Sequence, residues 1–205
     1  MNLNAVLPTL EKIAAFYDAL KYGHEGVEGY RKSTDLAKFL PCACRLWDSG
    51  VLDPEKTVFL DLGCADGRVN LLMSYFVRLS VGVEIDPEIL GEYGPRRRDL
   101  LEELHREKLV KPAGNVHLFS GDSLHPGTYE RIHRSLGIRF RDVDLFYTYI
   151  TLHDLFAQKI VSEAKPGARY LVYGFHKVLP RYEGLDVVDP DVGGGGIAAL
   201  YQVRR

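Results

Sequence analysis

The chain has 205 residues, of which 46% are hydrophobic, a formal net charge of -2 and an isoelectric point near 6.4. This length suits one globular domain, and no overall basic excess calls for a nucleic-acid partner, although a local patch would be enough. Cys42, Cys44 and Cys64 lack the CxxC spacing of disulfide frameworks and zinc sites, and no apolar run of about 18 residues spans a membrane. We therefore expect a cytoplasmic protein without metal or membrane insertion.

The first 55 residues have the pattern of a helical segment ahead of the main fold. Residues 5–21 carry apolar side chains at helical spacing, and three glycines then interrupt the chain. Residues 34–49 are helical again, although Pro41 weakens that pattern. We expect residues 1–55 to form a lid or substrate-side cover over a ligand-binding domain formed by residues 56–205.

From residue 57 onward, short β-rich runs alternate with amphipathic helical stretches. The predicted strands are 57–63, 79–86, 115–122, 142–150 and 168–175, and the predicted helices are 67–77, 87–109, 126–137 and 152–164. This alternation is typical of βαβ units with right-handed crossovers. The last runs, LDVVD and IAALYQVRR, flank four glycines. The expected fold is α/β: a Rossmann-like, doubly wound, mainly parallel sheet with an antiparallel C-terminal strand, preceded by N-terminal helices.

A glycine loop, DLGCADGR, follows the first of these strands at residues 61–68. Gly63 and Gly67 let the backbone turn sharply and approach a ligand, which in open α/β sheets binds at the carboxyl ends of the strands. The loop matches neither the phosphate-binding GxxxxGK[ST] nor the dinucleotide-binding GxGxxG pattern. Its acids, Asp61 and Asp66, repel a pyrophosphate. They favour a ligand with an amine or sulfonium, such as S-adenosylmethionine (SAM).

Two further acids end the next two strands. Glu84 lies about 20 residues beyond the loop, where an acid accepts hydrogen bonds from ribose hydroxyls. Asp122 ends the third strand beside Ser123 and could accept from the adenine amino group. Each acid alone could simply cap the helix that follows it. Capping does not explain three acids at successive strand ends together with the glycine spacing, so we expect one shared ligand.

The segments VFLDLGCADGR and VGVEIDPEIL resemble motif I and the following acidic strand of class I SAM-dependent methyltransferases, over residues 30–178. The resemblance implies that SAM binds at Asp61, Gly63, Cys64, Ala65, Gly67, Glu84, Ile85, Asp122 and Ser123. The DLGxxDGR form is also similar to small protein-lysine methyltransferases without a SET domain, in which a segment before motif I covers SAM. That similarity adds Tyr30 and Thr34, although a helix N-cap by Ser33 or Thr34 is the simpler explanation.

Candidates for action on the methyl acceptor follow the fourth strand. Tyr147 and Tyr149 share one face of the sheet. One could line an acceptor channel, or both could pack under a helix with satisfied hydroxyls. His153 and Asp154 could assist proton removal, or Asp154 could favour the helix N-terminus. His176, after the fifth strand, is a weaker candidate.

The acceptor itself is less well specified. The fourth strand reads DLFYTY and lacks the [DN]PP[YF] pattern of many amino-group methyltransferases, which weakens an amide or nucleobase acceptor. A short chain without an enclosing insert favours a macromolecular acceptor, and our main hypothesis is a protein lysine, which must lose a proton before transfer. The alternatives are a small-molecule methyltransferase and a non-catalytic SAM-binding interaction module. We interpret Arg96, Arg97 and Arg98 as a solvated, ion-paired helix face.

Overall fold

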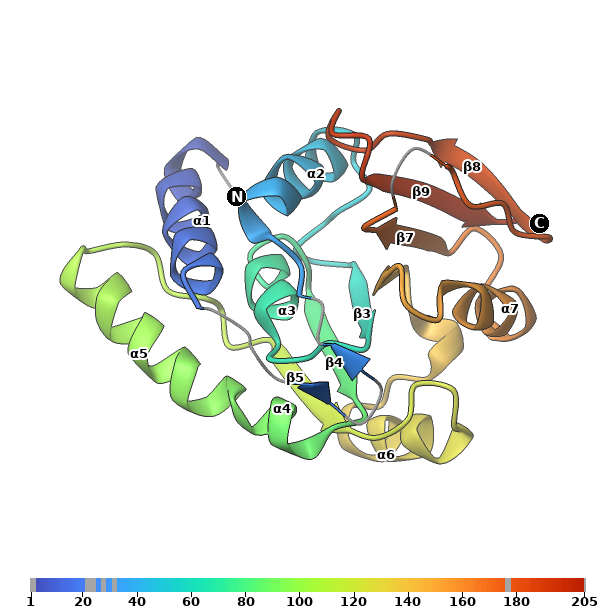
Figure 1. The fold of residues 1–205 in the computed structure, drawn as a ribbon, viewed down its shortest axis with the longest axis horizontal. Coiled ribbons are helices and arrows are strands. Elements are labelled where there is room, and N and C mark those ends of the chain that lie inside the picture. Colours follow the sequence, from blue (N-terminus) through green and yellow to red (C-terminus); the bar gives the residue numbers. More distant parts are fainter. Residues whose placement is uncertain (1–2, 21–24, 27–28, 31–32, 176–177, 205) are drawn as a thin grey trace.

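The computed structural model describes residues 3–20, 25–26, 29–30, 33–175 and 178–204 (Figure 1). Its centre is a seven-stranded sheet in the order β5-β4-β3-β6-β7-β9-β8. The strands are β3 (Val58–Leu62), β4 (Leu79–Glu84), β5 (Val116–Ser120), β6 (Leu145–Tyr149), β7 (Arg169–Tyr173), β8 (Leu185–Asp189) and β9 (Ala198–Val203). The first five are parallel, and β9 is antiparallel to both of its neighbours. The predicted α/β fold is confirmed.

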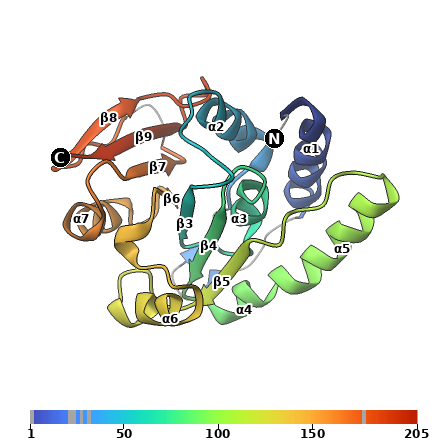
Figure 2. The ribbon, with the colours of Figure 1, turned by 180° about the vertical axis from the view of Figure 1, so that it is seen from behind.

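Helices cover both faces of this sheet, as Figure 1 and the reverse view in Figure 2 show. One core contains residues of α1 (Leu3–Asp18), α2 (Leu36–Asp48), α3 (Arg68–Met73) and α5 (Tyr93–Arg106). The other contains residues of α6 (Pro126–Leu136), the short 3-10 helix Phe140–Asp142 and α7 (His153–Glu163). Strand side chains alternate between the two, so Phe59 faces the first core while Val58 and Leu60 face the second. None of the helices in the described ranges has the length and apolar character needed to cross a bilayer.

The helix expected over residues 87–109 is divided into α4 (Pro87–Gly91) and α5. Pro95 has no N–H to donate to the carbonyl of Gly91, which interrupts the helical ladder at that point. A second difference is an antiparallel pair of very short strands, β1 (Glu25–Gly26) and β2 (Gly29–Tyr30), in the glycine-rich segment that we expected to be irregular. The order of the main sheet reverses between β3 and β6, so a topological switch point lies at their carboxyl ends.

Candidate functional site

The glycine loop after β3 is anchored to the next strand by backbone hydrogen bonds. The N–H groups of Gly63 and Cys64 both donate to the carbonyl oxygen of Val83 at 2.9 Å. Gly67 has a φ of +71°, and a Cβ there would lie 2.6 Å from Cδ1 of Leu118 and 2.8 Å from the Tyr93 ring. Both the left-handed backbone and the lack of space therefore require glycine at this position.

Asp61 lies at the end of β3, and its side chain is almost completely buried, with 2% exposed. Its Oδ1 atom has no hydrogen-bond partner among the described residues. Burial raises the pKa of this carboxyl well above its ordinary value, and the nearby charges of Glu84 and Asp66 raise it further. A buried carboxylate without a partner is costly, so the geometry suits a cationic ligand group at this atom.

Glu84, at the end of β4, holds the same loop from the neighbouring strand. Its Oε2 accepts a hydrogen bond from the N–H of Ala65 at 2.8 Å, and its Oε1 accepts from the N–H of Asp86 at 3.0 Å. Each carboxylate oxygen has a second lone pair, so both can still accept from a ligand diol. The next residue, Ile85, is 54% exposed and presents an apolar surface beside this carboxylate.

Asp122 follows β5 at the same edge, because the N–H of Gly121 donates to the carbonyl of Glu84 at 2.8 Å. The Oδ1 atom of Asp122 accepts from the N–H of Leu124 at 2.7 Å in a local turn, whereas the N-cap of α6 is His125, so Asp122 does not cap this helix. The backbone carbonyl of the buried Ser123 accepts from the Tyr129 hydroxyl at 2.5 Å. The structure thus brings Asp61, Glu84 and Asp122 to three adjacent strand ends.

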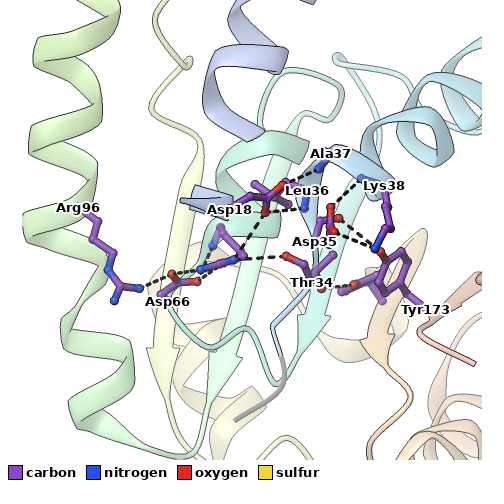
Figure 3. A network of polar contacts seen from close by, with 11 residues as sticks. Asp18, Thr34, Asp35, Leu36, Ala37, Lys38, Asp66, Arg96 and Tyr173 are labelled. Atoms are coloured by element: carbon purple, nitrogen blue, oxygen red, sulfur yellow. Dashed lines mark hydrogen bonds and ion pairs between the residues drawn. The ribbon is translucent and has the colours of Figure 1, made fainter. Parts of the chain in front are cut away.

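Asp66 differs from these acids. Our interpretation that Asp66, like Asp61, favours a cationic ligand needs correction. Its side chain is fully buried and forms ion pairs with Arg68 and with Arg96 of α5 (Figure 3). Its charge is balanced inside the protein. The ion pairing predicted for Arg96 is found, since it also binds Glu92 at 2.8 Å, but its solvated position is wrong, because its side chain is only 20% exposed. The sequence contains one sign of this pairing that we did not use, which is the positively charged Arg68 directly after Gly67.

The segment before α2 lies against the sheet close to this loop. The Thr34 hydroxyl is buried and lies 2.6 Å from the Tyr147 hydroxyl. Burial raises the pKa of Tyr147, as does the charge of the neighbouring Asp61. Tyr147 also packs edge-to-face on Phe39 of α2, so it matches the alternative of a packed tyrosine with a satisfied hydroxyl. The side chain of Tyr30 lies outside the described residues.

Two small residues of the loop have structural explanations. Cys64 is buried, and burial raises the pKa of its thiol well above the ordinary value, so this cysteine is not a reactive thiolate. Ala65 adopts a left-handed φ of 48°, and the Glu84 carboxylate holds its N–H group in that conformation. Both positions therefore shape the loop.

His153 and Asp154 begin α7 at the same edge of the sheet as the loop. The His153 Nδ1 atom lies 2.7 Å from the Tyr182 hydroxyl and 3.2 Å from Oδ1 of Asp154. The Tyr170 hydroxyl donates to the backbone carbonyl of His153 at 3.0 Å. Tyr182 is a contact that sequence reasoning missed, because it follows β7 and is 29 residues away in the chain. His176 lies outside the described residues.

No known protein family matches the chain, and a search of curated proteins finds no match. Solved structures do match. A putative RNA methyltransferase from Pyrococcus horikoshii is 16% identical, with a TM-score of 0.56 over 97% of this chain and 100% of that one. A tRNA methyltransferase from Aquifex aeolicus is 12% identical, with a TM-score of 0.55 over 97% and 76%.

A third match is an RNA methyltransferase from Salinibacter ruber, crystallised with S-adenosyl-L-homocysteine. It is 18% identical, with a TM-score of 0.50 over 80% of this chain and 92% of that one. At such identities the matches establish the fold alone, which this chain shares with these methyltransferases.

Proposed function

We propose that this chain is a SAM-dependent methyltransferase. The observation that carries the proposal is the buried carboxylate oxygen of Asp61, which has no hydrogen-bond partner among the described residues and lies where the strand order reverses. A buried carboxylate is stabilised by a positive partner, and the ammonium group of SAM supplies one. The Salinibacter protein of the same fold was crystallised with S-adenosyl-L-homocysteine (SAH), the product of SAM after methyl transfer, which supports this choice of ligand.

The remaining parts of the ligand fit the neighbouring strand ends. The second lone pairs of the Glu84 carboxylate accept hydrogen bonds from the two ribose hydroxyls. The exposed side chain of Ile85 offers an apolar surface for one face of the adenine ring. Asp122 and Ser123 border the adenine edge. Thr34 and Tyr30 belong to the segment that we propose covers the amino-acid end.

SAM, when bound, supplies the methyl group on its sulfonium and the leaving group for the displacement. The protein therefore contributes positioning and exclusion of water. Asp61 holds the ammonium end, and Glu84 fixes both the ribose and the loop through the N–H of Ala65. Of the acceptor-side candidates, His153 is the proposed proton acceptor, with Asp154 and Tyr182 orienting its Nδ1 side.

For the acceptor we keep a protein lysine side chain as the first candidate, because of the motif I resemblance. RNA is a second candidate, because three solved structures of the same fold are described as RNA methyltransferases. Our expectation that nucleic acid is not a partner has no support in these matches. Incubation of the enzyme with methyl-labelled SAM and a cell extract, followed by protease or ribonuclease digestion, separates the two. Label lost to protease and recovered as methyllysine after hydrolysis supports the lysine, and label lost to ribonuclease overturns it.

The proposed function is tested by calorimetric titration with SAM and SAH. We expect saturable micromolar binding to the wild-type protein. We expect binding at least about tenfold weaker in Glu84→Ala, because the variant loses both the ribose acceptor and the anchor of Ala65. Glu88→Ala is the matched control, since Glu88 is an exposed acid of α4 only four residues away. If the folded wild-type protein binds neither ligand, the proposal is wrong.

A further inference from the structure

The N-terminal helices meet the loop after β3 through a buried ionic cluster (Figure 3). Arg68, the first residue of α3, has a side chain that is only 5% exposed. It binds Asp66 with two parallel contacts, Nε to Oδ1 at 3.0 Å and Nη2 to Oδ2 at 3.1 Å. Its Nη1 atom donates to the carbonyl of Thr34 at 3.4 Å and lies 3.9 Å from Oδ1 of Asp18. One guanidinium thus joins the loop, the end of α1 and the turn before α2.

Asp18 extends this connection into α2. Its two carboxylate oxygens accept from the backbone N–H groups of Leu36 and Ala37, each at 2.9 Å. These are among the N–H groups at the start of a helix that have no partner within it. The Thr34 side chain meanwhile contacts Tyr147 of the sheet. Residues 33–37 are therefore held by α1, by α3 and by the sheet, and the contact to the loop runs through Arg68.

The chemistry of this contact requires arginine. A planar guanidinium can bind both oxygens of Asp66 and still present a third nitrogen to Thr34, whereas a lysine ammonium is a single point of charge. The Arg68 guanidinium also lies 5.3 Å from the centre of the Tyr17 ring. Burial lowers the pKa of Arg68 to about 10, so the group remains charged at neutral pH.

We propose that Arg68 is a positioning residue that holds residues 33–37 against the SAM-binding loop, so that SAM binding and the ordering of this segment stabilise each other. The inference rests on the proposed function, because that function places the ligand on this loop. Coupling of this kind is reciprocal: the ligand stabilises the segment by the same factor by which the docked segment stabilises the ligand. The amides of Leu36 and Ala37 report the docked state, because both donate to Asp18.

The test compares Arg68→Lys with the control Arg98→Lys, since Arg98 is an exposed arginine of α5. Hydrogen–deuterium exchange is measured with and without SAH, and calorimetry gives the Kd for SAH. In Arg68→Lys we expect exchange of residues 33–37 to become about tenfold faster without ligand and the Kd to rise by about tenfold. SAH should slow exchange of this segment in wild-type protein and much less in Arg68→Lys. Strand β7 should exchange as before, and the control should match wild type.

Three results would refute the proposal that Arg68 holds residues 33–37 against the loop. They are unchanged exchange of residues 33–37 in Arg68→Lys, faster exchange there with an unchanged Kd for SAH, or faster exchange throughout the sheet. The last would mean that Arg68 merely stabilises the whole fold. Failure of the wild-type protein to bind SAH refutes the proposed function instead. In that case, the exchange of the unliganded variants still decides whether Arg68 holds the segment.

Discussion

Replacement of Asp61 by asparagine separates the role of this residue in the fold from its role in the site. Asparagine has nearly the same shape but carries no charge. In the unliganded protein the wild-type carboxyl has a raised pKa, because it is buried and lies near the charges of Glu84 and Asp66. A tenfold weaker acid in the folded state corresponds to about 1.4 kcal/mol of lost stability at a pH above the raised pKa. We therefore expect Asp61→Asn to raise the free energy of unfolding at neutral pH by at least about 1 kcal/mol.

The stability of the wild-type protein should depend on pH with a definite sign. The folded wild-type protein keeps a proton on Asp61 that the unfolded chain has already released, so its stability falls as the pH rises from the ordinary value of 3.8 to the raised pKa. The Asp61→Asn variant lacks this fall. Urea unfolding at several pH values measures the difference, with Asp99→Asn, an exposed acid of α5, as the control.

The affinity for SAM should fall in Asp61→Asn, although the stability of the folded protein rises. The variant loses a charge-assisted hydrogen bond to the SAM ammonium, a loss of about 1.5 to 3 kcal/mol, and therefore about 10- to 100-fold in Kd. A variant that is more stable but binds SAM poorly has lost an acid used for ligand binding. A variant that is less stable than wild type and binds SAM equally well refutes this reasoning, because Asp61 would then be a structural residue.

Three further predictions concern the same edge of the sheet. Gly67→Ala should lower the unfolding free energy by about 1 to 3 kcal/mol more than Gly114→Ala in urea titrations, because both have a left-handed φ but only Gly67 has neighbours where the Cβ would lie. Tyr147→Phe should lower the unfolding free energy by about 1 kcal/mol in urea titrations, since it leaves the buried Thr34 hydroxyl without its partner. The affinity for SAH should rise with pH up to the raised pKa of Asp61 and then level off, and calorimetry in buffers of different ionisation enthalpy should detect a proton released on binding.

Local sequence patterns were sufficient to predict the sheet and its helices. Strand runs such as residues 57–63 are followed within a few residues by helical spacing, and the loop between them lies at the carboxyl end of a strand in the sequence as in the structure. The division of residues 87–109 into two helices was not predicted, although the sequence carries its signal in Pro95, which removes a specific hydrogen bond. The expected packing of a tyrosine under a helix is found for Tyr147, whose partner Phe39 belongs to α2.

Contacts between distant parts of the chain could not be predicted from the sequence. The hydroxyls of Thr34 and Tyr147 belong to residues 113 positions apart, and Asp66 meets Arg96 across 30 positions. Nothing in a helix with three consecutive arginines indicates which of them reaches back to the loop. That choice depends on how α5 packs against the first core, in which Leu100 and Leu104 are buried.

The two acids of the glycine loop show why burial alone does not identify a ligand-binding residue. Asp61 and Asp66 are five positions apart, and both are nearly inaccessible to water. Asp66 has its charge balanced by Arg68 and Arg96 inside the protein, so a ligand gains little from contacting it. Asp61 has an oxygen without a hydrogen-bond partner in the described part of the chain, and a perturbed carboxyl of this kind at a strand-order switch point is typical of a functional site. The pairing of Asp66 thus leaves Asp61 as the acid of this loop on which a cationic ligand can act.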